Sequence, residues 1–230
     1  MKNYKNYRYE DIKEKMMTNN LLRPLDILVV GATGGGKSSS INTFLGSNEA
    51  NIGYGVDPET IELNSYNLND WFRLWDSPGL GDTVDLDLEH SKKIENKLTK
   101  IVENPSYKNI GFIDMVLIVL EGGIRDIGTV LNLIKKNVLP NIEKERIVVG
   151  INQADFAMKG KNFDYEKKSP NKELKEFLEE KLISTQKRIE ESQNINVPVV
   201  YYSAETGYNM DKLLDTLILN IPKNKREIEN

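Results

Sequence analysis

The sequence contains no cysteine among its 230 residues. Disulfide bonds and thiolate metal ligands are therefore excluded. No stretch approaches the roughly 18 to 20 apolar residues that span a bilayer. The N-terminal residues, MKNYKNYRYEDIKEK, also lack the apolar core of a signal peptide. We therefore expect a cytoplasmic protein with no transmembrane segment.

The sequence also has little excess charge, with a formal net charge of −4, while 39% of its residues are hydrophobic and 29% are charged. These values are ordinary for a globular protein. Lys and Arg side chains bind most of the phosphates in nucleic-acid complexes. A mildly acidic chain is therefore a poor candidate for binding nucleic acid over an extended surface. We therefore expect that nucleic acid is not bound directly.

The first residues are polar and differ from the rest of the chain. Within residues 2–20, Tyr4, Tyr7, Ile12 and Met16 lie near helical spacing. This spacing predicts an N-terminal helix that packs against the main domain and ends before Pro24. The sequence thus predicts an N-terminal helical extension over 1–24, followed by one domain over 25–230.

Apolar runs and amphipathic segments alternate through that domain. The predicted strands are 25–31, 60–69, 71–76, 112–120, 146–152 and 197–204. The predicted helices are 37–45, 87–104, 128–139, one that follows a polar stretch and ends at Ile189, and 209–221. This alternation is typical of an α/β fold, with a mainly parallel sheet covered by helices on both faces.

The segment GATGGGKS, from Gly31 to Ser38, fits the pattern G-x-x-x-x-G-K-[ST] between a predicted strand and a predicted helix. Backbone N–H groups of such a loop and the positive helix end bind phosphates. Lys37 would reach the β- and γ-phosphates, and Ser38 would offer its hydroxyl to Mg²⁺. The expected phosphate-binding residues are Gly34, Gly35, Gly36, Lys37, Ser38 and Ser39.

A second motif, LWDSPGLGD, covers residues 74–82. Asp76 ends a predicted strand, where its carboxylate would hold a Mg²⁺-bound water. The N–H group of Gly79 would contact the γ-phosphate.

Two further strand ends carry residues suited to a nucleotide base, in GINQAD (150–155) and YYSAET (201–206). Asp155 would accept hydrogen bonds from N1–H and the exocyclic amine of guanine, a pair that adenine does not offer. Asn152 would bond the other edge of the base and tie its strand to the phosphate loop, and the Ala204 N–H would meet guanine O6. The expected base-site residues are Asn152, Gln153, Asp155, Ser203, Ala204 and Glu205.

Together, GATGGGKSS, GVDPET, WDSPGLGD, NQAD and YYSA resemble the Era-like GTPases of the translation-factor-related superclass, and are most similar to the YfjP-type bacterial subfamily. The resemblance covers residues 25–222. It implies a Ras-like P-loop NTPase fold, whose six-stranded sheet has one antiparallel strand. It also implies Mg²⁺ as cofactor and hydrolysis of GTP to GDP, with Thr60 as the switch-I threonine that coordinates Mg²⁺ in the GTP state.

The chain departs from this family at several positions. Gln153 replaces the lysine of N-K-x-D, whose stem covers the base, so affinity is expected to be modest. Leu80 stands where Ras has the glutamine that orients the attacking water. Gly34 replaces the P-loop asparagine of potassium-dependent relatives, which disfavours potassium activation. Because the sequence ends at Asn230 without an appended RNA-binding domain like that of Era, the expectation of an inherited ribosome role is weakened.

Other polar residues have competing interpretations. Arg125 follows a predicted strand. It is either an arginine finger, acting in cis or across a dimer, or part of a segment whose role is to hold the N-terminus of the next helix through Asp126. His90, the only histidine, is more typical of a solvated helix surface than of a catalyst. Asp82, Asp85 and Asp87 are better explained by an acidic helix N-terminus than by a metal site.

Two functions remain open at this point. The first is an enzyme, a slow Mg²⁺-dependent GTPase switch that uses Lys37, Thr60, Gly79 and, as an additional candidate, Arg125. It would be helped by a homodimer across the nucleotide face or by a protein effector. The second is a nucleotide-loaded scaffold or dimerisation module with negligible turnover, which Leu80 favours. Asp155 argues against a third reading, an ATPase.

Overall fold

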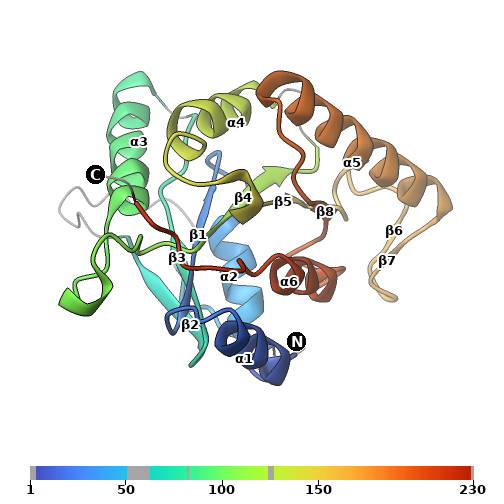
Figure 1. The fold of residues 1–230 in the computed structure, drawn as a ribbon. Coiled ribbons are helices and arrows are strands. Elements are labelled where there is room, and N and C mark those ends of the chain that lie inside the picture. Colours follow the sequence, from blue (N-terminus) through green and yellow to red (C-terminus); the bar gives the residue numbers. More distant parts are fainter. Residues whose placement is uncertain (1–3, 51–62, 82, 124–126, 229–230) are drawn as a thin grey trace.

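A central sheet organises the molecule in the computed structural model, which describes residues 4–50, 63–81, 83–123 and 127–228 (Figure 1). The strand order is β2-β3-β1-β4-β5-β8. The strands are β1 (Leu25–Gly31), β2 (Ser65–Asn69), β3 (Phe72–Asp76), β4 (Met115–Glu121), β5 (Ile147–Asn152) and β8 (Val199–Tyr201). All neighbours are parallel except β2, which is antiparallel to β3. The predicted fold class is confirmed.

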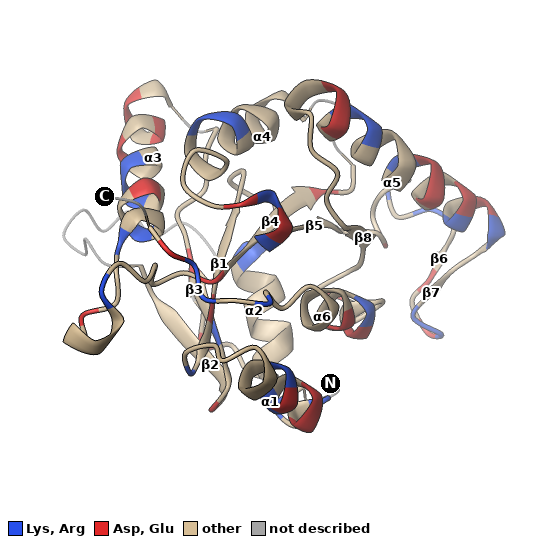
Figure 2. Cartoon of the chain, in the orientation of Figure 1, with Lys and Arg blue, Asp and Glu red and all other residues tan. Residues whose placement is uncertain are grey.

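Helices cover both faces of this sheet (Figure 1). The longer ones are α1 (Tyr9–Thr18), α2 (Lys37–Leu45), α3 (Val84–Thr99), α4 (Gly128–Leu133), α5 (Lys172–Gln193) and α6 (Met210–Leu219). One hydrophobic core lies beneath α1, α2 and α6, and a second lies beneath α3, α4 and α5. Acidic and basic residues are interspersed along α3 and α5 (Figure 2). Among the described residues, no helix is long and apolar enough to cross a membrane.

The central strands read as continuous apolar runs because they are buried on both sides. Side chains alternate between the two faces of a strand. In β1, Ile27 and Val29 belong to the first core, while Leu28 and Val30 belong to the second. This double burial fixes the register of β1, and it holds the loop that follows Gly31 at the carboxyl edge of the sheet.

The helix predicted over 87–104 is shifted in the structure. Helix α3 begins at Val84 because the Thr83 side chain accepts a hydrogen bond from the Leu86 N–H, which caps the helix. It ends at Thr99. Ile101, which lies within the helix predicted over 87–104, is exposed and forms an antiparallel bridge with Gly111. Apolar periodicity alone therefore misplaced both ends of this helix.

Other differences concern short elements. Within the polar stretch before α5, β6 (Phe163–Asp164) and β7 (Ser169–Pro170) form a small antiparallel hairpin. The helix predicted over 128–139 consists of α4 and a π-helical segment, Ile134–Val138. Short 3₁₀ helices occupy Pro105–Tyr107 and Lys144–Arg146.

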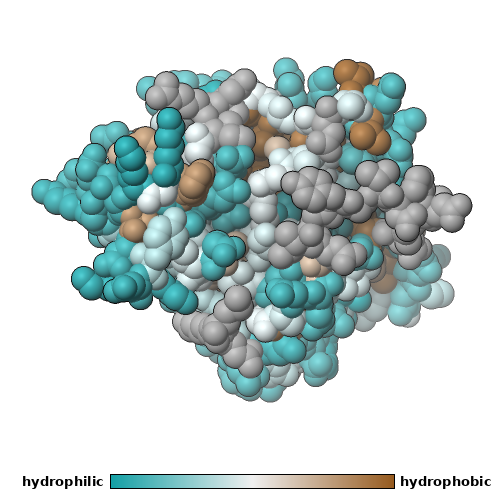
Figure 3. Space-filling model, turned by 180° about the vertical axis from the view of Figure 1, so that it is seen from behind, coloured by the Kyte–Doolittle hydropathy of each residue, from teal (hydrophilic) through white to brown (hydrophobic). Residues whose placement is uncertain are grey.

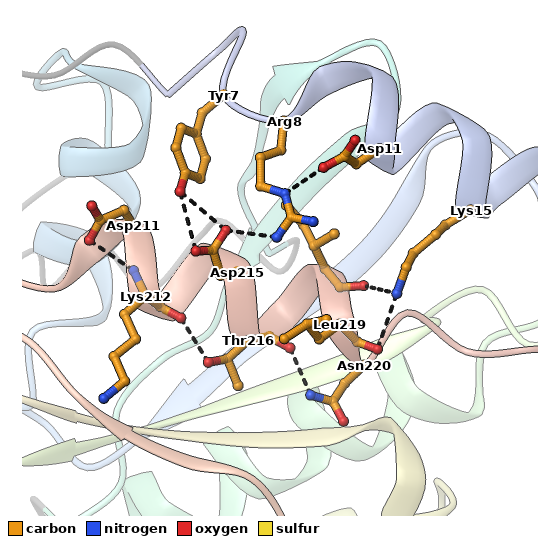
Figure 4. Close-up of polar contacts among 11 residues, drawn as sticks. Tyr7, Arg8, Asp11, Lys15, Asp211, Lys212, Asp215, Thr216, Leu219 and Asn220 are labelled. Atoms are coloured by element: carbon orange, nitrogen blue, oxygen red, sulfur yellow. Dashed lines mark hydrogen bonds and ion pairs between the residues drawn. The ribbon is translucent and has the colours of Figure 1, made fainter.

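The N-terminal segment is attached to α6 by polar contacts (Figure 4). The Tyr7 hydroxyl and the Arg8 guanidinium both donate to the Asp215 carboxylate, at 3.2 and 2.9 Å. The Lys15 ammonium donates to the Ile218 carbonyl at 3.0 Å. Tyr4 is buried, with its ring edge against Phe44. The N-terminal helix thus packs against α6 and the core beneath it.

A buried carboxyl group, Asp114, lies beside β1 at the edge of the sheet opposite the phosphate loop. Its Oδ2 accepts a hydrogen bond from the Asp26 N–H at 2.9 Å. Burial raises the pKa of Asp114 to about 7; the Asp26 carboxylate also raises it, whereas that hydrogen bond and the charges of Arg146 and Arg226 lower it. The folded protein therefore holds a proton that the unfolded chain releases near its ordinary pKa.

We expect this group to make stability fall as the pH rises from about 4 to about 7, because the folded state then binds more protons than the unfolded state. An Asp114→Asn variant stays neutral and keeps an acceptor oxygen. Its melting temperature relative to the wild type should therefore increase by several degrees between about pH 5 and about pH 8. Thermal unfolding followed by circular dichroism measures this, with the exposed Asp85→Asn as control. Parallel pH profiles for Asp114→Asn and the wild type would contradict the prediction.

Candidate nucleotide site

The loop between β1 and α2 has a conformation that depends on glycine. Gly36, directly before α2, has a left-handed backbone with φ 87°. A Cβ on Gly36 would overlap the side-chain amide of Asn152. The loop therefore approaches the end of β5 more closely than any other residue type would permit.

Lys37 opens α2 and is largely buried, with 8% of its surface exposed. Its ammonium group donates to the carbonyl oxygens of Gly31 at 3.3 Å and Ala32 at 3.0 Å. These contacts hold the positive charge within the loop, where an anion bound by the loop amides would meet it.

Ser38 and Asp76 form the other part of the phosphate end. The Ser38 hydroxyl donates to Oδ2 of Asp76 at 2.6 Å. Oδ1 of Asp76 is buried and has no hydrogen-bond partner. Burial raises the pKa of Asp76, while the Ser38 hydrogen bond and the Lys37 charge lower it. A hydroxyl beside an unpartnered carboxylate oxygen fits Mg²⁺ with a coordinated water, since hard cations prefer oxygen ligands.

Asn152, at the end of β5, connects three segments next to Gly35 and Gly36 of the loop. Its amide nitrogen donates to the Gly35 carbonyl at 3.0 Å, and its oxygen accepts the Ala204 N–H at 3.0 Å. The tie between β5 and the phosphate loop lies where the sequence placed it. However, the Ala204 N–H is already engaged, so a bond from it to guanine O6 would have to be shared with Asn152.

Asp155 lies beside this junction and is 6% exposed. Its Oδ1 is buried without a partner. Gln153 has a left-handed backbone, and its side chain donates to the Gly34 carbonyl at 3.2 Å. Gln153 thus contacts the loop from the position where the family has lysine.

Two exposed aromatic residues near Asp155 were not singled out by sequence reasoning. Phe156 is 57% exposed and Tyr165, on the β6–β7 hairpin, is 52% exposed. The Phe156 ring and the Tyr165 hydroxyl both lie near Gly160. Burial raises the pKa of Tyr165, and the Asp155 and Glu205 charges raise it further. In the sequence, the aromatic residue Phe156 directly after Asp155 was the feature that could have indicated these exposed rings.

The segment after β3 runs along the phosphate loop. The Thr33 N–H donates to the Leu80 carbonyl at 2.9 Å, and the Leu80 N–H donates to the Gly31 carbonyl at 3.3 Å. Leu80 itself is 5% exposed and belongs to the core beneath α3. Its side chain is thus committed to packing.

The remaining predicted residues vary in position. Ser39 lies in the first turn of α2, Ser203 is fully buried at the end of β8, and Glu205 is exposed on the loop that follows. Thr60 and Arg125, together with Asp82 and Asp126, lie outside the described residues. His90 is not a simple surface residue, because its Nδ1 contacts the Gly79 carbonyl oxygen at 2.6 Å.

Figure 3 shows the molecule from behind, where hydrophilic side chains predominate and a hydrophobic patch lies at the upper right, over the start of α3. The exposed apolar residues there are Val84, Leu86 and Leu88.

Comparison with known proteins agrees with this geometry. Residues 26–153 match the family model described as 50S ribosome-binding GTPase. GTPase Der of Dinoroseobacter shibae is 27% identical over 202 residues, covering 85% of this chain, and GTPase Der of Ruegeria pomeroyi is 25% identical over the same length. The chain spans about a third of the length of these relatives, 35% in each case.

Solved structures share the fold at low sequence identity. Toc33 from Arabidopsis thaliana superimposes with a TM-score of 0.67 at 16% identity, over 99% of this chain and 94% of that one. Era bound to MgGDPNP and a 16S ribosomal RNA fragment gives a TM-score of 0.57 at 16% identity, over 90% and 60%. The family match includes the phosphate loop, the Asp76 motif and Asn152, so this chain belongs to the family of 50S ribosome-binding GTPases.

Proposed function

We propose that this protein binds GTP with Mg²⁺, hydrolyses it slowly to GDP and phosphate, and acts as a molecular switch. One observation carries the proposal. Among the described residues, only three buried side-chain polar atoms lack a partner, and two of them are carboxylate oxygens, on Asp76 and Asp155. Buried acceptors are nearly always satisfied. Asp76 bonds Ser38 of the phosphate loop, and Asp155 follows Gln153, which bonds Gly34 of the same loop, so a bound nucleotide with its metal ion would satisfy both oxygens.

At the phosphate end, the loop amides of 34–39 and the Lys37 ammonium would bind the β- and γ-phosphates. Ser38, Asp76 through a water, and Thr60 would hold Mg²⁺, which neutralises charge that develops on the phosphates. Gly79 would contact the γ-phosphate through its N–H group.

At the base end, Asp155 would accept the two donors of guanine through its unpartnered oxygen and its neighbour. Gln153, Ser203 and Glu205 would border the base. Each amide atom of Asn152 makes one hydrogen bond within the protein, which holds the walls of the pocket together. The second N–H of its amide would bond the other edge of the base.

The position of Leu80 supports slow turnover. Its side chain is apolar and packed in a core, so it supplies no hydrogen bond to an attacking water. The same observation favours a second candidate function, a nucleotide-loaded scaffold whose role is partner capture and whose turnover is negligible.

Catalytic help would then come from a second copy of the chain or from a protein effector. The exposed apolar residues at the start of α3 lie directly after the Gly79 segment and offer a contact surface there. For the structurally similar pair atToc33 and psToc159, dimerisation is described as important for GTPase activity. Arg125 is the candidate finger in this proposal.

The finer family assignment is also a proposal. The motifs GATGGGKSS, WDSPGLGD, NQAD and YYSA support a YfjP-type GTPase, while GVDPET lies largely outside the described residues. The contacts of α1 with α6 support treating 1–24 as an extension that packs on a GTP-binding domain over 25–230.

A single-turnover experiment with GTP or ATP, with and without Mg²⁺, tests this function. We expect Mg²⁺-dependent cleavage of GTP alone, at roughly 10⁻⁴ to 10⁻² per second for dilute protein. The rate should rise with protein concentration or with a partner, and Arg125→Ala should remove that rise while GTP affinity is kept. Rapid turnover that is independent of concentration would contradict the need for help. Equal use of ATP would contradict the guanine assignment.

A further inference from the structure

Helix α3 holds the segment that precedes it. Nδ1 of His90 lies 2.6 Å from the Gly79 carbonyl oxygen. One turn earlier, Oδ1 of Asp87 accepts the Gly81 N–H at 2.8 Å. Residues three apart lie on the same face of a helix, so these two side chains act on the same stretch of chain. A carbonyl oxygen only accepts hydrogen bonds, so Nδ1 of His90 is the donor.

The opposite side of the same segment is tied to the phosphate loop. Leu80 exchanges backbone hydrogen bonds with Gly31 and Thr33. Gly79 lies so close to Thr33 that a Cβ would overlap its backbone. The peptide group between Gly79 and Leu80 is therefore held from both directions, its carbonyl by α3 and its N–H by β1.

Under the proposed function, this arrangement would affect only the γ-phosphate end of the nucleotide. Gly79 follows Asp76 by three residues and lies against the loop that ends in Lys37. A γ-phosphate would reach this point, whereas the β-phosphate of GDP would stay deeper in the loop. Under the proposed function, a contact that fixes Gly79 would therefore affect triphosphate binding more than diphosphate binding.

We propose that His90 is a positioning residue of the switch. By donating to the Gly79 carbonyl it fixes the Gly79–Leu80 peptide. This limits the movement of Gly79, whose N–H, in the preceding peptide, would meet the γ-phosphate. This inference rests on the proposed function and adds to it a residue outside the family motifs. The alternative is a structural contact that only anchors the start of α3.

The two roles predict different measurements. Loss of one hydrogen bond corresponds to an affinity change of about five- to tenfold. We expect His90→Ala to weaken binding of a non-hydrolysable GTP analogue by that factor and to slow single-turnover hydrolysis at least as much. GDP affinity should stay within about twofold of the wild type. A merely structural contact would instead lower the melting temperature and affect both nucleotides equally.

Two further variants sharpen the test. His90→Asn places an amide donor near the position of Nδ1 and should restore most of the analogue affinity. Lys92→Ala, exposed on the same helix, should behave as the wild type. Fluorescent GDP and GTP-analogue titrations measure all of these.

An unchanged analogue affinity in His90→Ala, or equal losses for GDP and the analogue, would overturn the inference while leaving the proposed function in place. A failure of the wild-type protein to bind either guanine nucleotide would reject the proposed function itself.

Discussion

The Lys37→Ala variant is expected to lose GTP and GDP binding by about a hundredfold or more, because it removes the one ammonium group held inside the phosphate loop. In the described structure, that group is fixed by the carbonyls of Gly31 and Ala32 and is largely buried. Because this ammonium group is already positioned before the ligand binds, it loses little conformational entropy on binding. Its removal should therefore weaken nucleotide binding by nearly the full interaction energy.

The fold should survive this change, since Lys37 lies at the edge of the sheet and outside both cores. Titration with a fluorescent guanine nucleotide measures the affinity, and circular dichroism measures the melting temperature. Lys136→Ala, which removes an exposed lysine from the π-helical segment, is the matched control. Wild-type affinity in Lys37→Ala would show that the loop does not bind phosphate.

The Asp155→Asn variant should bind GTP about tenfold to a hundredfold more weakly and should gain affinity for xanthosine triphosphate. Oδ1 of Asp155 is a buried acceptor with no partner, so guanine donors would satisfy it. An asparagine offers an amide donor in its place, and the 2-oxo group of xanthine accepts it.

Competition between the two triphosphates measures this change in preference. Asp164→Asn, on the neighbouring hairpin, alters a carboxylate that is bonded to the backbone N–H groups of Glu166 and Lys167, and it should keep the wild-type preference. If Asp155→Asn weakened the binding of both nucleotides equally, Asp155 would support the shape of the pocket without distinguishing between the bases.

The strands were the most predictable part of the fold, for a physical reason. Strands buried on both faces need uninterrupted apolar runs, and LDILVV and RIVVGIN provide them. The ends of α3 were less predictable, because they depend on a side-chain cap at Thr83 and on a bridge between Ile101 and Gly111. The β6–β7 hairpin was missed because strands of two residues leave no periodic pattern.

In the site, the motifs predicted which residues stand at the strand ends, and the parallel sheet brings those ends to one edge. Sequence could not show how these residues bond to each other. The double engagement of Asn152 depends on the distance between β5 and the loop, and the contact of His90 with Gly79 depends on the path of the chain into α3. Such contacts are set by tertiary packing, which composition and spacing do not encode.

Under the proposed function, the burial of Leu80 has a consequence for the evolution of this protein. In a Ras-like protein, the residue at this position faces the reaction, so one codon change can create or abolish efficient hydrolysis. Here a glutamine at position 80 would first have to leave the core beneath α3, where an unpaired amide costs about 1 to 3 kcal/mol. A single substitution at position 80 is therefore not expected to speed intrinsic hydrolysis. Selection for a different rate would more readily act on the surface of a binding partner than on this segment.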